Sequence, residues 1–463
     1  MKRFALFCAC LLAVVTGQSR AAPLDALSPE AREELAYSTG IQAFIYAYPL
    51  LHVNQFRHLF HSPAAPSYRG PANQLNHFRE LANASSKGTA ASPNNDTLYT
   101  LTFMDLSEQP VVVETPDMGD RYFTIQLADF YATNFGDIGT RHNNGAAGKY
   151  LLVGPHWQGT PPPGITQVFR SPTPWAMTLL RILVDNRDEL EAVHVIQDSF
   201  KLSTLDDRPL PAFDPSQLPG IPEANNPSQL WAVINRELTA NPPPAADAPL
   251  VDQFAPIGIG PGQSEDISQL DPAIQRGLNR AAAAGMKIVL QAANDISGDT
   301  TYNGWGYPHP DIGDYGTDYL YRAGVTRMGL MANEPAEATY LSLYTDAQGQ
   351  SLQGNQRYRL HFAADELPPA KAFWSITIYD RDTYKLVENG INRYSIGDRT
   401  EGIQFAEDGS LSITISQDTP DAQYRPNWLP APAGEFYLIM RIYLPEDNVI
   451  AQQWQPPALE VLQ

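Results

Sequence analysis

The fold is easiest to predict from residues 436–444, FYLIMRIYL, near the carboxyl end of the chain. Large apolar side chains occupy every second position there: Phe436, Leu438, Met440, Ile442 and Leu444. Successive side chains of a β-strand point to opposite faces of the sheet, so this period of two places one face in a core. The segment is therefore predicted to be a strand.

The same alternation occurs in three earlier segments of the last third of the chain. These are residues 358–362, 374–378 and 411–415. Turn-forming residues separate them, as at Asp408-Gly409 and Pro432-Ala433-Gly434. Short strands at this spacing are typical of an antiparallel sandwich or jelly roll.

The first half of the mature chain combines strands with helices. Residues 111–114, 123–127, 149–153 and 175–184 read as strands. Apolar spacings of three and four predict helices that begin at Ser28 and span 188–200, 227–239 and 271–294. We expect Pro49 to kink or end the first of them. The segment 205–265 is dense in proline, and the helix predicted at 271–294 has an apolar face that must be covered by packing. Both features indicate a packed connection rather than a free linker.

The first 21 residues are predicted to be a signal peptide. Lys2 and Arg3 precede an apolar run of a dozen residues, which is too short for a bilayer span of about 20 residues. Ser19 and Ala21 suit cleavage after Ala21. We therefore expect a periplasmic or secreted protein that does not insert in the membrane after cleavage.

Charge and cysteine content exclude several classes of function. Both cysteines lie in the predicted signal peptide, so the mature chain has no disulfide and no thiolate chemistry. The full chain carries a formal net charge of −20. This charge argues against binding nucleic acid or an anionic membrane through a general field.

Several motifs together resemble the paired domain families DUF1254 and DUF1214. The first family is represented by SPNNDTLY (92–99), RYF (121–123) and YLLVGP (150–155), and the second by YGTDYLYRA (315–323), FWSIT (373–377), RYSIGDR (393–399) and NWLPAP (427–432). The resemblance implies an exported two-domain protein of jelly-roll type and implies little about activity.

These patterns together predict a mainly β protein with helical segments (α+β). Two antiparallel sandwich- or jelly-roll-like domains are expected, joined by a helical, proline-rich region. We place the signal peptide at 1–21, the DUF1254-like domain at 22–204, the connecting region at 205–334 and the DUF1214-like domain at 335–463.

The usual catalytic signatures are absent from the sequence. It contains no G-x-S-x-G elbow, no H-E-x-x-H and no P-loop. The nine histidines are scattered, so we predict neither a metal site nor a cofactor.

The polar cluster Asn94-Asn95-Asp96 is the first candidate site. Three amide or carboxylate side chains in a row can direct several hydrogen-bonding groups into one pocket, with Asp96 as a general base and Tyr99 beside them. The alternative is a turn in which these side chains cap their own backbone.

An aromatic segment supplies the second candidate site. Trp305, Tyr315 and Tyr319 lie among glycines and acids, and flat rings of this kind stack on sugars. Packing between the domains is the alternative. Arg322 needs a partner, which would be Asp96, Asp318 or a ligand acid. We expect Asp96 and Tyr315 to be catalytic, with Asn94, Asn95, Tyr99, Trp305, Tyr319 and Arg322 binding the ligand, and Asp96 within reach of Arg322.

Three functions fit these features. The first is binding, with or without processing, of a glycan or similar polyhydroxylated molecule in an inter-domain cleft. The second is hydrolysis, or another enzymatic conversion, of a small apolar or aromatic compound, and the third is a structural role without catalysis. The sequence alone does not separate them, and it leaves the oligomeric state open.

Overall fold

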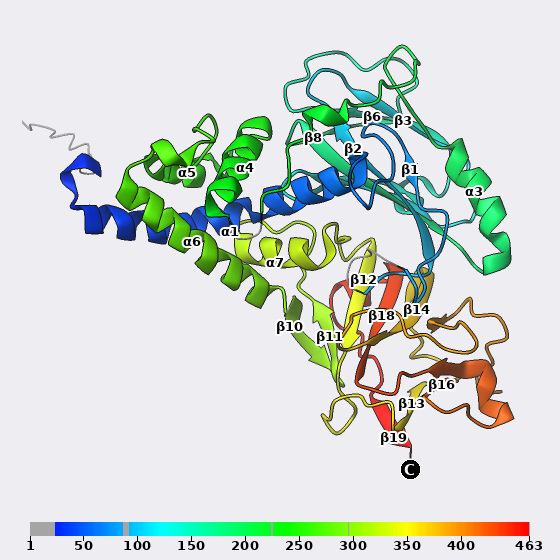
Figure 1. Ribbon diagram of the computed structural model, residues 1–463. Coiled ribbons are helices and arrows are strands. Elements are labelled where there is room, and N and C mark those ends of the chain that lie inside the picture. Colours follow the sequence, from blue (N-terminus) through cyan, green and yellow to red (C-terminus); the bar gives the residue numbers. More distant parts are fainter. Residues whose placement is uncertain (1–23, 87–91, 224–225, 295, 463) are drawn as a thin grey trace, which may run out of the picture.

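Two β-domains and a helical arm make up the protein (Figure 1). The computed structural model describes residues 24–86, 92–223, 226–294 and 296–462. The predicted signal peptide lies outside these residues. The expected α+β class with sandwich-like sheets is confirmed.

The N-terminal domain contains two sheets that pack around one apolar core. The five-stranded sheet has the order β1 (Asn76–His77), β2 (Thr97–Asp105), β8 (Trp175–Leu183), β4 (Phe123–Asp129) and β5 (Asn134–Gly139). The four-stranded sheet has the order β7 (Gln167–Arg170), β6 (Gly148–Val153), β3 (Val111–Thr115) and β9 (Lys201–Ser203). Helix α2 (Thr140–Asn143) follows β5, and α3 (Leu190–Ser199) precedes β9.

The C-terminal domain is also built from two sheets. The six-stranded sheet has the order β10 (Ser297–Tyr302), β11 (Trp305–Pro308), β12 (Ala338–Leu343), β18 (Phe436–Pro445), β14 (Ala370–Asp380) and β15 (Ser395–Gly397). The four-stranded sheet has the order β17 (Trp428–Pro430), β16 (Leu411–Ser416), β13 (Arg357–Phe362) and β19 (Leu459–Leu462). The alternating segment 436–444 lies in β18, a central strand that pairs with β12 and β14. Strands β10 and β11 join this sheet from the segment assigned to the connecting region. Among the described residues of both domains, the strand pairs are antiparallel except β6 with β7 and β16 with β17, which are parallel.

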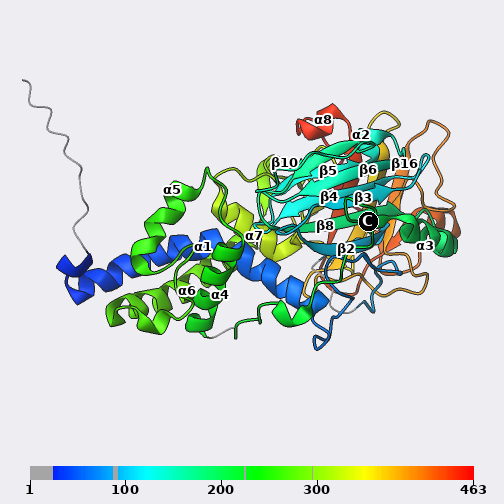
Figure 2. The ribbon, with the colours of Figure 1, turned by 90° about the horizontal axis from the view of Figure 1, so that it is seen from above.

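The helical arm extends to one side of the β-domains (Figures 1 and 2). Its longer helices are α1 (Pro29–His61), α4 (Pro227–Ala240), α6 (Pro272–Ala292) and α7 (Tyr319–Gly329). The short helix α5 (Ala248–Val251) lies beside them, and α8 (Asp447–Ile450) follows β18. Within the described residues there are also six 3₁₀ turns: Leu24–Ala26, Arg187–Glu189, Pro215–Gln217, Asp252–Ile257, Ile267–Gln269 and Ala422–Asn427.

Helix α1 begins where the sequence predicts but does not end at Pro49. The Ser28 hydroxyl accepts a hydrogen bond from the Ala31 amide, and the helix continues through the buried Pro49 to His61. Tertiary packing on α4, α6 and α7 outweighs the backbone hydrogen bond that proline removes.

Small residues let α1 and α6 approach closely. A Cβ atom at Gly277 would lie 2.4 Å from the Glu33 carbonyl oxygen, and one at Gly285 would lie 2.6 Å from the Phe44 ring. Leu278 and Val289, on the apolar face of α6, are fully buried. The expectation that this face is covered by packing is confirmed.

Candidate functional site

The loop 92–96, which precedes β2, docks on the six-stranded sheet of the other domain. The Tyr379 hydroxyl donates to the Pro93 carbonyl (2.8 Å), and Arg441 donates to the Ser92 carbonyl (2.9 Å). The Asn94 amide donates to the Tyr443 hydroxyl at 2.5 Å. Residues of β14 and β18 therefore satisfy the polar groups of this loop.

Asp96 combines a local turn with a contact between the domains. Its backbone N–H donates to the Asn94 side-chain oxygen at 2.6 Å, the turn that the sequence left as an alternative. Its carboxylate accepts from the Ser375 hydroxyl (2.7 Å) and from Arg399 (3.1 Å). Asp96 is only 4% exposed, so these two partners replace the water that its charge loses.

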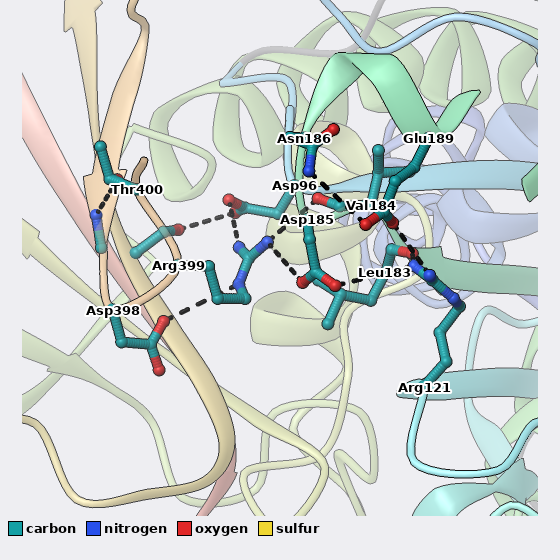
Figure 3. Close-up of polar contacts among 12 residues, drawn as sticks. Asp96, Arg121, Leu183, Val184, Asp185, Asn186, Glu189, Asp398, Arg399 and Thr400 are labelled. Atoms are coloured by element: carbon teal, nitrogen blue, oxygen red, sulfur yellow. Dashed lines mark hydrogen bonds and ion pairs between the residues drawn. The ribbon is translucent and has the colours of Figure 1, made fainter. Parts of the chain in front are cut away.

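Arg399 is the centre of this polar cluster (Figure 3). Besides Asp96, it donates to the Val184 carbonyl at 3.0 Å and lies 3.7 Å from carboxylate oxygens of Asp185 and Asp398. Burial raises the pKa of Asp398 to about 6, although Arg399 acts in the opposite direction. We call Asp96, Asp185, Ser375, Asp398 and Arg399 the inter-domain lock, because they fasten the N-terminal sheet to β14 and the loop after β15.

The prediction that Asp96 meets Arg322 is wrong. The residues that contact Asp96 differ from those that contact Arg322. Arg399, from the opposite β-domain, supplies the cation that Asp96 needs. Asp96 is therefore placed as part of an inter-domain contact, and its contacts give no support to a role as general base.

Arg322 lies instead in a cage of tyrosine rings in the helical arm. Its guanidinium carbon is 5.0 Å from the ring centres of Tyr46 and Tyr319 and 5.3 Å from that of Tyr131. It donates to the Tyr46 carbonyl. Tyr46 and Tyr319 both donate their hydroxyls to Asp247, at 3.0 and 2.7 Å. The cage ties α1 and α7 to the loop after β4, which is a structural arrangement.

The other predicted aromatics are dispersed. Trp305 is fully buried in the C-terminal core, and its indole N–H donates to the Pro457 carbonyl. Tyr315 is 3% exposed and packs on Tyr321. Tyr99 is half-buried in β2 beside Arg181, and Asn95 is half-buried in the docked loop. These residues form no common surface for stacking on a sugar.

A polar recess lies between the two β-domains, at a place that the sequence analysis did not identify. Its lining is almost entirely amide or carboxylate: Gln126, Asn134, Gly136, Asp137, Asn333, Glu334 and Glu337. The first four belong to β4 and β5, and the last three precede β12. The recess measures about 10 Å³, which is about the space that one water molecule needs.

Glu337 is the most perturbed acid in the recess. The Tyr122 hydroxyl donates to one of its oxygens (2.6 Å) and Arg141 donates to the other (2.9 Å). Burial and the neighbouring carboxylate of Asp137 raise the pKa of Glu337 to about 7, against the effect of Arg141. Arg141 and His142 both pair with Asp137. A carboxyl group with this pKa can give up or take a proton near neutral pH.

Arg181 supports the lining of the recess from the inner side by hydrogen bonds to two lining side chains. It is buried, and it donates to the side chains of Gln126 (2.8 Å) and Asn333 (2.9 Å) and to the Met331 carbonyl. Gln126 in turn donates to Asn134 and to the Ala332 carbonyl. These bonds fix the amides of the lining in one orientation.

The sequence held only one indication of this recess. Tyr122 belongs to the motif RYF, which carried the family resemblance, but its partner Glu337 lies 215 residues further along the chain. A pairing over that distance needs the topology of both domains, which the local pattern does not supply.

The comparisons with known proteins concern the same two regions. Residues 72–204 match the family described as "Protein of unknown function (DUF1254)", and residues 337–447 match "Protein of unknown function (DUF1214)". The chain belongs to this two-domain DUF1254/DUF1214 family. The recess of this DUF1254/DUF1214 protein takes Gln126 and Asp137 from the first matched region and Glu337 from the second.

A solved structure from Vibrio parahaemolyticus shows the same fold. The chain is 23% identical to the VPA0106 protein from Vibrio parahaemolyticus, with a TM-score of 0.72 over 92% of this chain and 100% of that one. A putative uncharacterized protein from Burkholderia cenocepacia aligns with 13% identity and a TM-score of 0.45, over 94% of each chain. No curated protein matches the chain significantly.

None of the helices formed by the described residues combines the length and the hydropathy of a membrane span. No group of three or more His, Cys, Asp or Glu side chains in the same described part of the chain is arranged to hold a metal ion.

Proposed function

We propose that the protein binds a small polyhydroxylated molecule, such as a sugar, at the recess around Glu337. The observation that carries this proposal is the lining itself, which is polar and is contributed by both β-domains. Sites for small molecules commonly lie at domain boundaries and hold a few convergent polar groups with perturbed pKa values.

The size and chemistry of the recess favour a hydroxyl group. A space of about 10 Å³ accommodates one water-sized group, so one hydroxyl of a ligand would enter while the rest lies outside. Carboxylates and amides are the side chains that exchange hydrogen bonds with hydroxyls. The mouth is polar as well, since Glu334 and His142 are partly exposed there.

Processing of the ligand would depend on Glu337. Its carboxyl group is the one in the recess whose pKa is raised to about 7, so it is suited to transfer a proton to or from a bound hydroxyl. The polar lining gives no support to the alternative of an apolar or aromatic substrate. We propose no cofactor for this chemistry.

The proposal includes a location outside the cytoplasm. The predicted cleavage after Ala21 supports it, and the mature protein would begin at Ala22. Mass spectrometry of the protein purified from its native source tests this point. A mass that retains Cys8 and Cys10 would contradict it.

A thermal-shift screen of the mature protein against sugars and polyols tests the binding. A ligand that binds only the folded state raises the melting temperature. We expect at least one polyol to do so, and we expect Glu337→Gln to abolish the shift. Glu366→Gln, which changes an exposed acid in the C-terminal domain, is the matched control and should keep it. If no polyol shifts the wild-type melting temperature, the proposed function is wrong and a structural role remains.

A further inference from the structure

The amide and guanidinium side chains at the recess already donate to partners within the protein, and Asn134 and Asn333 each keep one amide hydrogen. Gln126 donates to the Asn134 side chain and to the Ala332 carbonyl. Asn134 also donates to the Ala332 carbonyl, and Asn333 donates to the Tyr340 hydroxyl. Arg141 donates to carboxylates that line the recess. A ligand therefore finds few donors there.

Acceptors, in contrast, remain in excess. Each ionised carboxylate offers about four lone-pair positions. Glu337 uses one oxygen for Tyr122 and the other for Arg141, and each oxygen keeps capacity for a further bond. Glu334 is 38% exposed and lies 3.8 Å from its nearest cation, Arg141, so its carboxylate is largely open to a ligand.

The charge of the recess points in the same direction. Asp137, Glu334 and Glu337 face Arg141, and His142 adds a charge only when it is protonated. Arg181, on the inner side, is enclosed and bonded to neutral groups. The pKa of Glu334 is raised by burial and by Asp137, and that of Glu337 is raised for the same reasons. Both shifts therefore arise first from burial and then from the negative charge of Asp137, and Arg141 offsets them only in part.

We infer that the recess selects ligands that carry a protonated amine beside their hydroxyl groups, such as amino sugars or other amino polyols with a free amine. This inference rests on the proposed function and names its ligand class. An ammonium group brings three donors and one positive charge to a lining that has unused acceptors and excess negative charge. An anionic sugar brings further acceptors and a negative charge to this lining, so the recess rejects it.

Three matched probes test the selectivity: glucamine, sorbitol and gluconate. They share one polyol chain and differ at one end, which is an ammonium, a hydroxyl or a carboxylate. Isothermal calorimetry at pH 7 should show glucamine binding about tenfold more tightly than sorbitol, with gluconate weaker than both. Glucamine binding should also release protons, measured from its heat in two buffers of different ionisation enthalpy, because the ammonium favours the ionised form of Glu337.

A variant at the mouth separates the inference from the proposed function. Glu334→Gln changes a partly exposed side chain, so the fold should persist, and the preference for glucamine over sorbitol should shrink. Equal binding of sorbitol and glucamine to the wild type would overturn the inference and leave the proposed function standing. No binding of any probe, nor of any polyol in the wider screen, would overturn both.

Discussion

The inter-domain lock provides the sharpest test of how the two β-domains are held together. Replacing Asp96 by Asn keeps the size of the side chain but removes the charge that faces Arg399 at 3.1 Å. Arg399 would keep Asp185 and Asp398, each at 3.7 Å, so part of its charge remains compensated. A hydrogen bond to a charged group contributes about 1.5–3 kcal/mol, and the loss should fall in this range.

A double-mutant cycle measures the pair itself. Asp96→Asn, Arg399→Met and the double variant are unfolded by denaturant, with tryptophan fluorescence as the readout. We expect a coupling free energy of about 1.5–3 kcal/mol. Asp185→Asn is the control, since Asp185 is 44% exposed and lies further from Arg399, and it should cost less than about 0.5 kcal/mol. A coupling below about 0.5 kcal/mol would refute the lock.

Three further outcomes follow from the same contacts. Glu237→Gln leaves the Arg57 charge buried without its 2.7 Å partner and should cost about 3–5 kcal/mol by denaturant unfolding; a cost below 1 kcal/mol would contradict the buried pair. Glu337 and Asp398 have pKa values raised to about 7 and about 6, so the native state binds more protons than the unfolded state. The free energy of unfolding should therefore fall as pH rises from 5 to 8, and Glu337→Gln should flatten that slope; an unchanged slope would contradict the raised pKa. Arg322→Met should lower the melting temperature yet leave polyol binding intact. Loss of binding without loss of stability would show that Arg322 belongs to the binding site.

Local pattern was enough to predict most elements of the fold. The alternation in β18 and the apolar stripe of α6 follow from side-chain periodicity, and the predicted helix near residues 227–239 is α4. The sequence left open whether α1 is kinked or ends at Pro49, because burial of this helix depends on partners from residues 227 to 329. Propensity at one residue does not report such packing.

The candidate site was much less predictable. The motifs SPNNDTLY, FWSIT and RYSIGDR do meet in the structure, but they do so as an inter-domain contact. Arg322 and Arg399 both follow a motif that contains aspartate and tyrosine, so the sequence does not distinguish them as partners of Asp96. The partner is decided by which strand faces the loop 92–96. Asp137, Glu334 and Glu337 stand in no motif that marks them. The chemistry of Glu337 arises from burial and from Tyr122, Asp137 and Arg141, which belong to the other domain.

The central claim is that the recess around Glu337 holds a hydroxyl group of the ligand. A crystal structure of the mature protein, soaked with the polyol that gives the largest thermal shift, measures this directly. We predict ligand density at the mouth of the recess, with a hydroxyl or ammonium group about 3 Å from the carboxylate of Glu337 or Asp137. Ligand bound at another surface, with the recess holding only water, would contradict the account.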